Sequence, residues 1–129
     1  MIKEEHTIIV GAGPCGLACA LELKENGIHP LIIEKENIVN TIYKFPTHQT
    51  FFSTSEKLEI GGIPFTTPND KPVRNEALAY YREIVRRNEL RVNLFEKAIH
   101  IEKEGNGYIL TTIKKEQKKY YRAKYIIIA

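Results

Sequence analysis

The chain is poor in cysteine: Cys15 and Cys19 are the only two among its 129 residues. Two cysteines four positions apart provide no disulfide framework, and they are typical of a protein from a reducing compartment. A long hydrophobic run is also missing, since the apolar stretch before Gly11 is far too short for a signal peptide or a membrane span. We therefore expect a cytoplasmic protein with no membrane partner.

A strong charge of either sign is absent as well. The formal net charge is +3 and the pI is about 8.8, which is too mild to indicate a nucleic-acid partner. The single basic stretch is better interpreted as a solvated turn between strands. Its members are Lys114, Lys115, Lys118, Lys119, Arg122 and Lys124. The composition is that of a globular domain, and we expect neither nucleic acid nor a metal ion to bind.

The most informative stretch of the chain is a glycine fingerprint. A short apolar run, residues 8–10, is followed by glycines at positions 11, 13 and 16, which gives the spacing G-x-G-x-x-G. The spacing predicts a buried strand, a tight turn at Gly11, close approach of a pyrophosphate at Gly13, and close helix–strand packing at Gly16. Pro14 suits the first turn of the helix, whose free amides form a phosphate site.

The residues after the fingerprint complete a strand–helix–strand unit. Residues 17–26 are good helix formers, and Gly27 follows at a C-cap position. Residues 30–33 indicate a second buried strand, which ends in Glu34. A carboxylate about 20 residues beyond such glycines accepts hydrogen bonds from the hydroxyls of an adenosine ribose. The unit therefore predicts that residues 1–35 bind a dinucleotide.

Residues 35–73 contain little periodic structure, and a segment this long without clear elements is usually functional. The segment is rich in aromatic and small hydrogen-bonding side chains, a mixture that suits a large planar ligand with a polar edge. For Phe51 and Phe52 we favour the other interpretation, that both rings fold back into the core.

The rest of the chain predicts one further helix and a series of strands. Residues 75–87 carry Leu78, Tyr81 and Val85 on one stripe, which is typical of an amphipathic helix. Residues 105–107 predict a hairpin turn. The expected strands cover residues 90–94, 97–103, 108–113, 119–123 and 125–129. The last strand is a continuous apolar run, which we expect to be buried on both faces.

The order of these elements resembles the FAD domain of two-dinucleotide-binding flavoproteins, a group that includes thioredoxin reductases and flavin-containing monooxygenases. The implied fold class is α/β: a Rossmann-like FAD-binding domain with a parallel sheet and a three-stranded antiparallel meander. The chain stops on its final strand. We therefore expect residues 1–129 to be the N-terminal part of an FAD/NAD(P)-binding domain, incomplete at its C-terminus and lacking the NADPH domain.

Within that group the chain resembles the bacillithiol-disulfide reductase family of Gram-positive bacteria. The resemblance covers essentially the whole chain, and its specific part is the middle, because many flavoproteins share the fingerprint. The segments that carry it are residues 11–17, Pro46–Ser53, Ser55–Gly61 and Lys71–Asn75.

The resemblance implies an NADPH-dependent flavin disulfide reductase. FAD is then the tightly bound cofactor, NADPH the electron donor, and a small-molecule disulfide, bacillithiol disulfide, the acceptor. The full-length protein is expected to be a homo-oligomer, and the fragment alone is expected to be inactive. Thioredoxin reductases carry a redox-active C-x-x-C motif, which this chain lacks.

The resemblance also assigns site residues by their positions in the motifs. The FAD pyrophosphate would be surrounded by Gly11, Gly13, Pro14, Cys15 and Gly16. The adenosine would be held by Glu34 at the ribose, by Lys35 beside the adenine and by the backbone of Ala98 at the adenine edge. The isoalloxazine or its ribityl chain would be approached by His48, Gln49 and Thr50.

Cys15 has two interpretations. A helix N-terminus favours the thiolate, so the residue could relay electrons as a catalytic cysteine, and the family resemblance supports this role. A bound pyrophosphate would oppose that negative charge, and Cys15 could instead be a small side chain that fills a tight loop. Cys19 lies one helical turn later, where regular helix geometry points the two Cβ atoms badly for a disulfide, so we expect Cys19 to serve in packing.

Two other functions share parts of this pattern. A flavin-dependent monooxygenase has the same architecture, and a dinucleotide-binding module without catalysis would need only the fingerprint and Glu34. A dehydrogenase that uses NAD alone is disfavoured, because the meander before the last strand belongs to the flavoprotein pattern.

Overall fold

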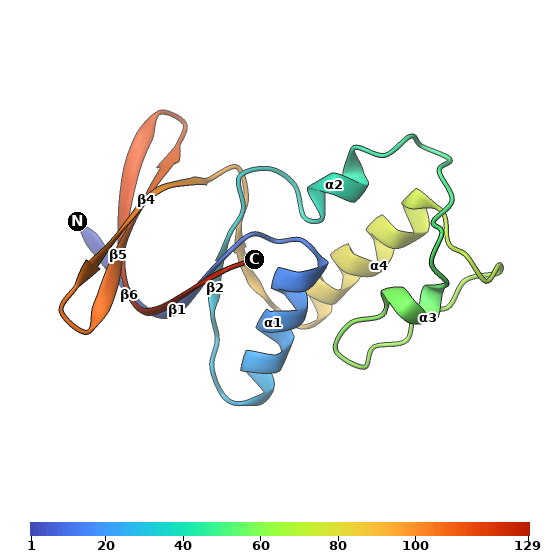
Figure 1. Cartoon of the computed structure of the whole chain (residues 1–129), viewed down its shortest axis with the longest axis horizontal. Coiled ribbons are helices and arrows are strands. Elements are labelled where there is room, and N and C mark those ends of the chain that lie inside the picture. The colour runs from blue at the N-terminus through green and yellow to red at the C-terminus, as the bar shows by residue number, and fades with distance from the viewer.

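The structure is a computed structural model that describes residues 1–129 (Figure 1). In chain order the elements are β1 (Ile2–Val10), α1 (Pro14–Glu25), β2 (Leu31–Ile33), α2 (Asn40–Tyr43), α3 (Ser55–Leu58), α4 (Arg74–Arg87), β3 (Arg91–Asn93), β4 (Lys97–Glu104), β5 (Gly107–Lys114) and β6 (Gln117–Ile128). The predicted α/β class is confirmed. None of the helices combines the length and the hydropathy needed to span a membrane.

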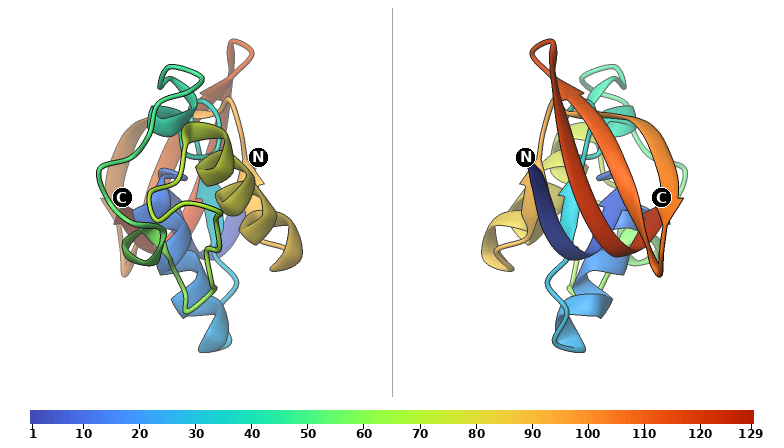
Figure 2. Two further views of the ribbon diagram at one scale, coloured as in Figure 1. Left: turned by 90° about the vertical axis from the view of Figure 1, so that its right-hand side faces the viewer. Right: turned by 90° about the vertical axis from the view of Figure 1, so that its left-hand side faces the viewer.

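All six strands belong to one sheet with the order β3-β2-β1-β6-β5-β4. The first four run parallel: Ile8 of β1 pairs with Leu31 of β2 on one side and with Ile126 of β6 on the other. Strands β4, β5 and β6 form the predicted antiparallel meander. The helices lie on one side of the molecule and the meander on the opposite side (Figure 2). Strand β6 therefore joins the parallel part of the sheet to the meander.

The core has two parts because successive residues of a strand face opposite sides of the sheet. Ile9 and Ile32 face helices α1 and α4, where they pack with Leu17 and Tyr81. The other face carries the second cluster, which consists of Ile8, Leu31, Ile33, Leu110, Tyr121 and Ala123. Burial on both faces explains why residues 8–10 of β1 and 31–33 of β2 are continuous apolar runs.

The end of the chain differs from the sequence-based prediction. Residues 119–123 and 125–129 were expected to be separate pieces, but β6 passes through both without a break, with Lys124 exposed between them. Burial on both faces is also wrong for the last strand, since Tyr125 is 50% exposed and Ile128 is 68% exposed. The pairing of β6 with β1 is made by backbone hydrogen bonds and does not require these side chains to be buried; the Tyr125 ring contacts the His6 ring of β1, with 5.5 Å between the ring centroids, and remains half exposed.

The long aperiodic segment, residues 35–73, holds only the short helices α2 and α3. Phe51 folds back as predicted, with its ring 5.7 Å from that of Phe45. The same prediction is wrong for Phe52, which is 95% exposed. Thr50 pairs with Val73 in an isolated bridge, and the Phe51 amide donates to the Pro72 carbonyl oxygen at 2.9 Å. The chain bends at the next residue, Phe52.

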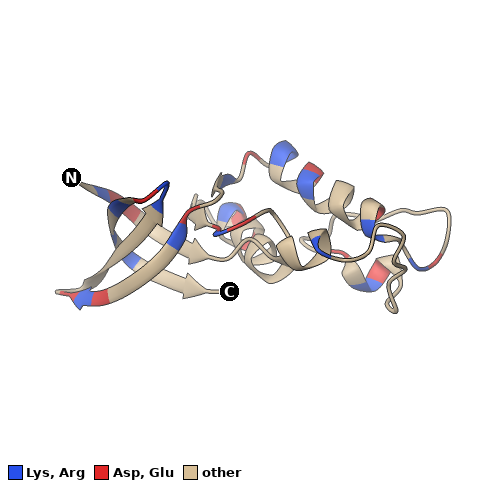
Figure 3. Ribbon diagram, turned by 90° about the horizontal axis from the view of Figure 1, so that it is seen from above, with Lys and Arg blue, Asp and Glu red and all other residues tan.

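The basic stretch contains the predicted turn between strands at Lys115, whereas Lys118, Lys119, Arg122 and Lys124 belong to strand β6. Lys115 and Glu116 both have positive φ (49° and 65°) and connect β5 to β6. Arg122 of β6 forms ion pairs with Glu4 of the neighbouring strand β1 and with Glu104 at the end of β4. Basic and acidic residues are consequently interspersed over the meander (Figure 3).

Candidate functional site

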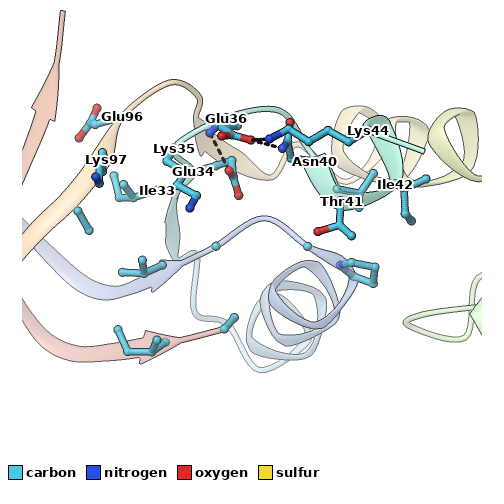
Figure 4. A pocket seen from close by; sticks show the side chains of 18 of the residues that line it. Ile33, Glu34, Lys35, Glu36, Asn40, Thr41, Ile42, Lys44, Glu96 and Lys97 are labelled. Atoms are coloured by element: carbon cyan, nitrogen blue, oxygen red, sulfur yellow. Dashed lines mark hydrogen bonds and ion pairs between the residues drawn. The ribbon is translucent and has the colours of Figure 1, made fainter. Parts of the chain in front are cut away.

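A cavity of about 830 Å³ lies at the carboxyl ends of β1 and β2 (Figure 4). Five segments line it: the fingerprint turn, the residues after β2, helix α2 with its flanks, the residues that lead into β4, and the end of β6. Parallel strands place such a crevice outside their carboxyl ends, which is where open α/β sheets bind ligands. The fingerprint and Glu34 therefore share one cavity.

The fingerprint glycines have three different structural roles. Gly11 has a φ of +114°, which L side chains rarely adopt. A Cβ on Gly16 would lie 2.1 Å from the carbonyl oxygen of Gly11, so this glycine permits the close packing of helix against turn. A Cβ on Gly13 would meet no atom within 4 Å, because this position faces open space. Gly11 and Gly13 line the cavity, and Gly16 supports the turn from behind.

The N-terminus of α1 offers unpaired donors beside this open space. The amides of Gly13, Cys15 and Gly16 donate to no group of the chain, and Pro14 has no N–H. The first helical hydrogen bond runs from the Leu17 amide to the Gly13 carbonyl oxygen at 3.0 Å. Free amides at a helix N-terminus, together with the positive end of the helix dipole, favour an anion.

The carboxylate of Glu34 is buried and held at both oxygens, and Figure 4 shows its contact with the residues that follow it. Oε1 accepts a hydrogen bond from the Ala12 amide at 2.8 Å, and Oε2 accepts one from the Glu36 amide at 2.7 Å. Each carboxylate oxygen can accept a second hydrogen bond, so both retain capacity for a ligand hydroxyl. The contact with Ala12 fixes the acidic group to the fingerprint turn.

The opposite wall of the cavity was not predicted. Asn40 and Lys44, which belong to α2 and its C-cap, both contact the Glu36 carboxylate, with Lys44 Nζ 3.3 Å from Oε2 (Figure 4). Lys35 lines the cavity and is exposed. Nothing in the aperiodic sequence after Glu34 signals a four-residue helix here, because helices this short depend on tertiary contacts.

The third wall is the segment that leads into β4. Ala98 lines the cavity immediately before a register shift in the pairing of β4 with β5. Glu96 is fully buried, and its carboxylate accepts hydrogen bonds from Thr112 Oγ1 at 2.7 Å and from the Tyr121 hydroxyl at 2.6 Å. Burial, reinforced by the Glu96 carboxylate, raises the pKa of Tyr121 above its ordinary value. The sequence-based interpretation missed Glu96 because its partners come from distant strands.

The remaining predicted residues lie outside the lining of this cavity. His48 is exposed, and Gln49 and Thr50 belong to the segment tied to the start of α4, where the Gln49 carbonyl oxygen accepts from the Arg74 amide at 2.9 Å. Cys15 is exposed in the first turn of α1. Cys19 is half-buried and packs against the core, as expected.

These features fit a ligand that has both a pyrophosphate and a ribose. The open space at Gly13 and the free amides suit the anion, and the anchored Glu34 carboxylate suits two neighbouring hydroxyls. What the arrangement can do chemically is bind and orient a dinucleotide. The cavity itself holds no nucleophile paired with a base.

Comparison with known proteins confirms the resemblance that the middle of the chain indicated. The chain is 53% identical to Bacilliredoxin reductase Bdr of Bacillus subtilis over 98% of its own length, and it spans 38% of that relative. Among solved structures, Bacillithiol Disulfide Reductase Bdr from Bacillus cereus has a TM-score of 0.95 and 57% identity, with coverage of 98% of this chain and 39% of that one.

More distant structures share the fold. Flavin-containing monooxygenase from Stenotrophomonas maltophilia has a TM-score of 0.89 at 19% identity, with coverage of 99% of this chain and 38% of that one. The model of the family described as pyridine nucleotide-disulphide oxidoreductase matches residues 8–129. The chain therefore belongs to the pyridine nucleotide-disulphide oxidoreductase family.

Proposed function

We propose that residues 1–129 are the N-terminal, FAD-binding part of an NADPH-dependent flavin disulfide reductase that acts on bacillithiol disulfide. The observation that carries the proposal is the anchored Glu34 carboxylate, which shares a cavity with the fingerprint turn beside the free amides of α1. The relatives with 53% and 57% identity support the reaction class, since one of them is named a disulfide reductase. Bound FAD supplies a group that accepts and passes on two electrons.

In this proposal the chain's residues bind and orient the cofactor. Gly11, Gly13 and Pro14 shape the pyrophosphate site, and the amides of Cys15 and Gly16 donate to the anion. At the adenosine end, Glu34 accepts from the ribose hydroxyls, Lys35 lies beside the adenine, and the Ala98 backbone meets the adenine edge.

The segment that contains His48, Gln49 and Thr50 is proposed to approach the isoalloxazine or the ribityl chain. These residues lie beyond the cavity lining, on the segment tied to α4 by the bridge between Thr50 and Val73. Cys15 is proposed as the redox-active cysteine, because its side chain is exposed next to the pyrophosphate site. The NADPH site, a homo-oligomeric state and a cytoplasmic location are proposed for the full-length protein.

The monooxygenase alternative has weaker support. The monooxygenases among the solved structures are 16–20% identical, which is evidence for the fold alone. The disulfide reductases among them are 48% and 57% identical.

The proposal is tested with the full-length protein under anaerobic conditions, where NADPH oxidation is followed in the presence of bacillithiol disulfide. We expect NADPH to be consumed in proportion to the disulfide that is reduced. Oxidation only when oxygen is admitted, with a hydroxylated product, would support the monooxygenase instead. A protein that binds FAD and reduces no acceptor would be a binding module.

Replacing Glu34 with glutamine should weaken FAD binding by about 1–3 kcal/mol, because charge-assisted hydrogen bonds to the ribose are lost while side-chain volume is kept. Equilibrium titration of the apoprotein with FAD measures the effect. Glu36→Gln is the matched control: this carboxylate also lines the cavity, but Asn40 and Lys44 already occupy it. Equal affinities in the wild type and Glu34→Gln would exclude this role for Glu34.

A further inference from the structure

Glu96 is the fully buried acidic residue of the segment that leads into β4. Its Oε2 accepts hydrogen bonds from Thr112 of β5 and from Tyr121 of β6, at 2.7 Å and 2.6 Å. Oε1 has weaker partners, since Asn93 Nδ2 lies 3.4 Å away and Lys119 Nζ lies 3.9 Å away. The side chain therefore anchors this segment to strands β5 and β6 of the meander.

The backbone of the same residue contacts the predicted ribose acceptor. The Glu96 amide donates to the Glu34 carbonyl oxygen at 3.0 Å, and the Glu34 amide donates to the Asn93 carbonyl oxygen at 2.9 Å. Glu34 is thus held between two points of the segment 93–96. Two residues further on, Ala98 forms the cavity wall.

The position of this segment, and with it that of Glu34, depends on the hydrogen bonds that the Glu96 carboxylate accepts. A buried carboxylate must keep its donors, because an unpaired charge in the interior is strongly destabilising. Loss of one hydroxyl would leave Oε2 with a single donor, and we expect the carboxylate then to shift toward a replacement partner. Such a movement shifts the segment 93–98 and with it Glu34 and Ala98.

We propose that Glu96 is a positioning residue for the adenosine half of the cofactor. Held by the hydroxyls of Thr112 and Tyr121, Glu96 fixes the positions of Glu34 and of the Ala98 backbone. It does not contact the cofactor itself. Glu96 lies at the edge of the cavity lining, next to Lys97 (Figure 4), and its carboxylate is occupied by the hydroxyls of Thr112 and Tyr121. The proposal rests on the proposed FAD site.

The test compares Thr112→Val, which removes the hydroxyl and keeps the shape, with Thr112→Ser, which keeps the hydroxyl. Tyr121→Phe is a second variant that removes the other donor. The full-length apoprotein is titrated with FAD and, separately, with ADP, at a temperature where each variant is folded. Thr112→Val and Tyr121→Phe should each weaken both ligands by the same factor, about tenfold, whereas Thr112→Ser should match the wild type.

A purely structural role gives a different result. Thr112→Val and Tyr121→Phe would then lower the unfolding midpoint and leave both affinities unchanged, which would overturn the proposal. Glu102→Gln removes an exposed carboxylate of β4 and serves as the control for charge. It should change neither affinity.

A failure of the proposed function is recognised separately. If the wild type binds neither FAD nor ADP, the FAD site is wrong, and hydrogen exchange of the apoprotein then decides the role of Glu96. Faster exchange of the Glu96 and Glu34 amides in Thr112→Val, with Thr112→Ser unchanged, would support the positioning role. Exchange identical to the wild type would overturn it.

Discussion

A Gly16→Ala variant is expected to lose about 3 kcal/mol or more of stability and to be purified without flavin. The new Cβ would lie 2.1 Å from the Gly11 carbonyl oxygen and 3.4 Å from the Ala129 Cβ. The first of these neighbours is backbone, so it cannot move aside as a flexible side chain would. The turn must open, and the free amides beside Gly13 then lose their common direction. Thermal unfolding and the flavin absorbance of the purified full-length protein measure both effects.

Gly13→Ala is the matched control for this variant. A Cβ there meets no atom within 4 Å, so the variant should unfold like the wild type. Its methyl group nevertheless occupies the space proposed for the pyrophosphate, and flavin affinity should fall. A Gly16→Ala protein with wild-type stability and full flavin content would show that the turn does not have the packing described here.

Cys15→Ala is expected to reduce the rate of disulfide reduction by about a thousandfold or more while flavin content stays normal. Cys15 is exposed in the first turn of α1, where its sulfur is accessible to a disulfide substrate. Alanine is small enough for the same loop, and transfer of a hydride from NADPH to the flavin does not involve the thiol. Stopped-flow measurement of flavin reduction and steady-state disulfide turnover separate the two steps.

Cys19→Ala is the control for this experiment. Cys19 is half-buried against the core, so its removal should lower stability slightly and leave turnover intact. Wild-type disulfide turnover in a flavin-loaded Cys15→Ala protein would exclude a redox role for Cys15. Loss of flavin from that variant would contradict both the redox and the space-filling interpretations.

The part of the site that could be predicted from sequence depends on short-range rules. The strand, the turn at Gly11 and the start of α1 follow one another directly, and the positive φ of Gly11 is a local property. Glu34 follows at the end of the next strand, and parallel strands bring their carboxyl ends to one edge. The predicted hairpin and the helix with Leu78 and Tyr81 on its buried face were likewise set by local periodicity.

The part that could not be predicted depends on contacts between distant segments. Glu96 looks like any surface glutamate in the sequence, and its burial depends on hydroxyls at positions 112 and 121. The continuous β6 was missed because Lys124 resembles a break, although a charged side chain can sit on the exposed face of a long strand. Phe52 and Phe51 have the same chemistry, and the contacts that distinguish them come from distant residues: Phe51 is tied to Pro72 by its amide and packs against Phe45, whereas Phe52 is exposed.

The cofactor content of the purified full-length protein tests the central claim most directly. The account predicts a yellow protein with the absorbance bands of a flavin, from which denaturation releases stoichiometric FAD. It also predicts that ADP competes with FAD for the apoprotein, because the cavity beside Glu34 is the proposed site for the adenosine and its pyrophosphate. A colourless protein that takes up no FAD on titration would contradict the account.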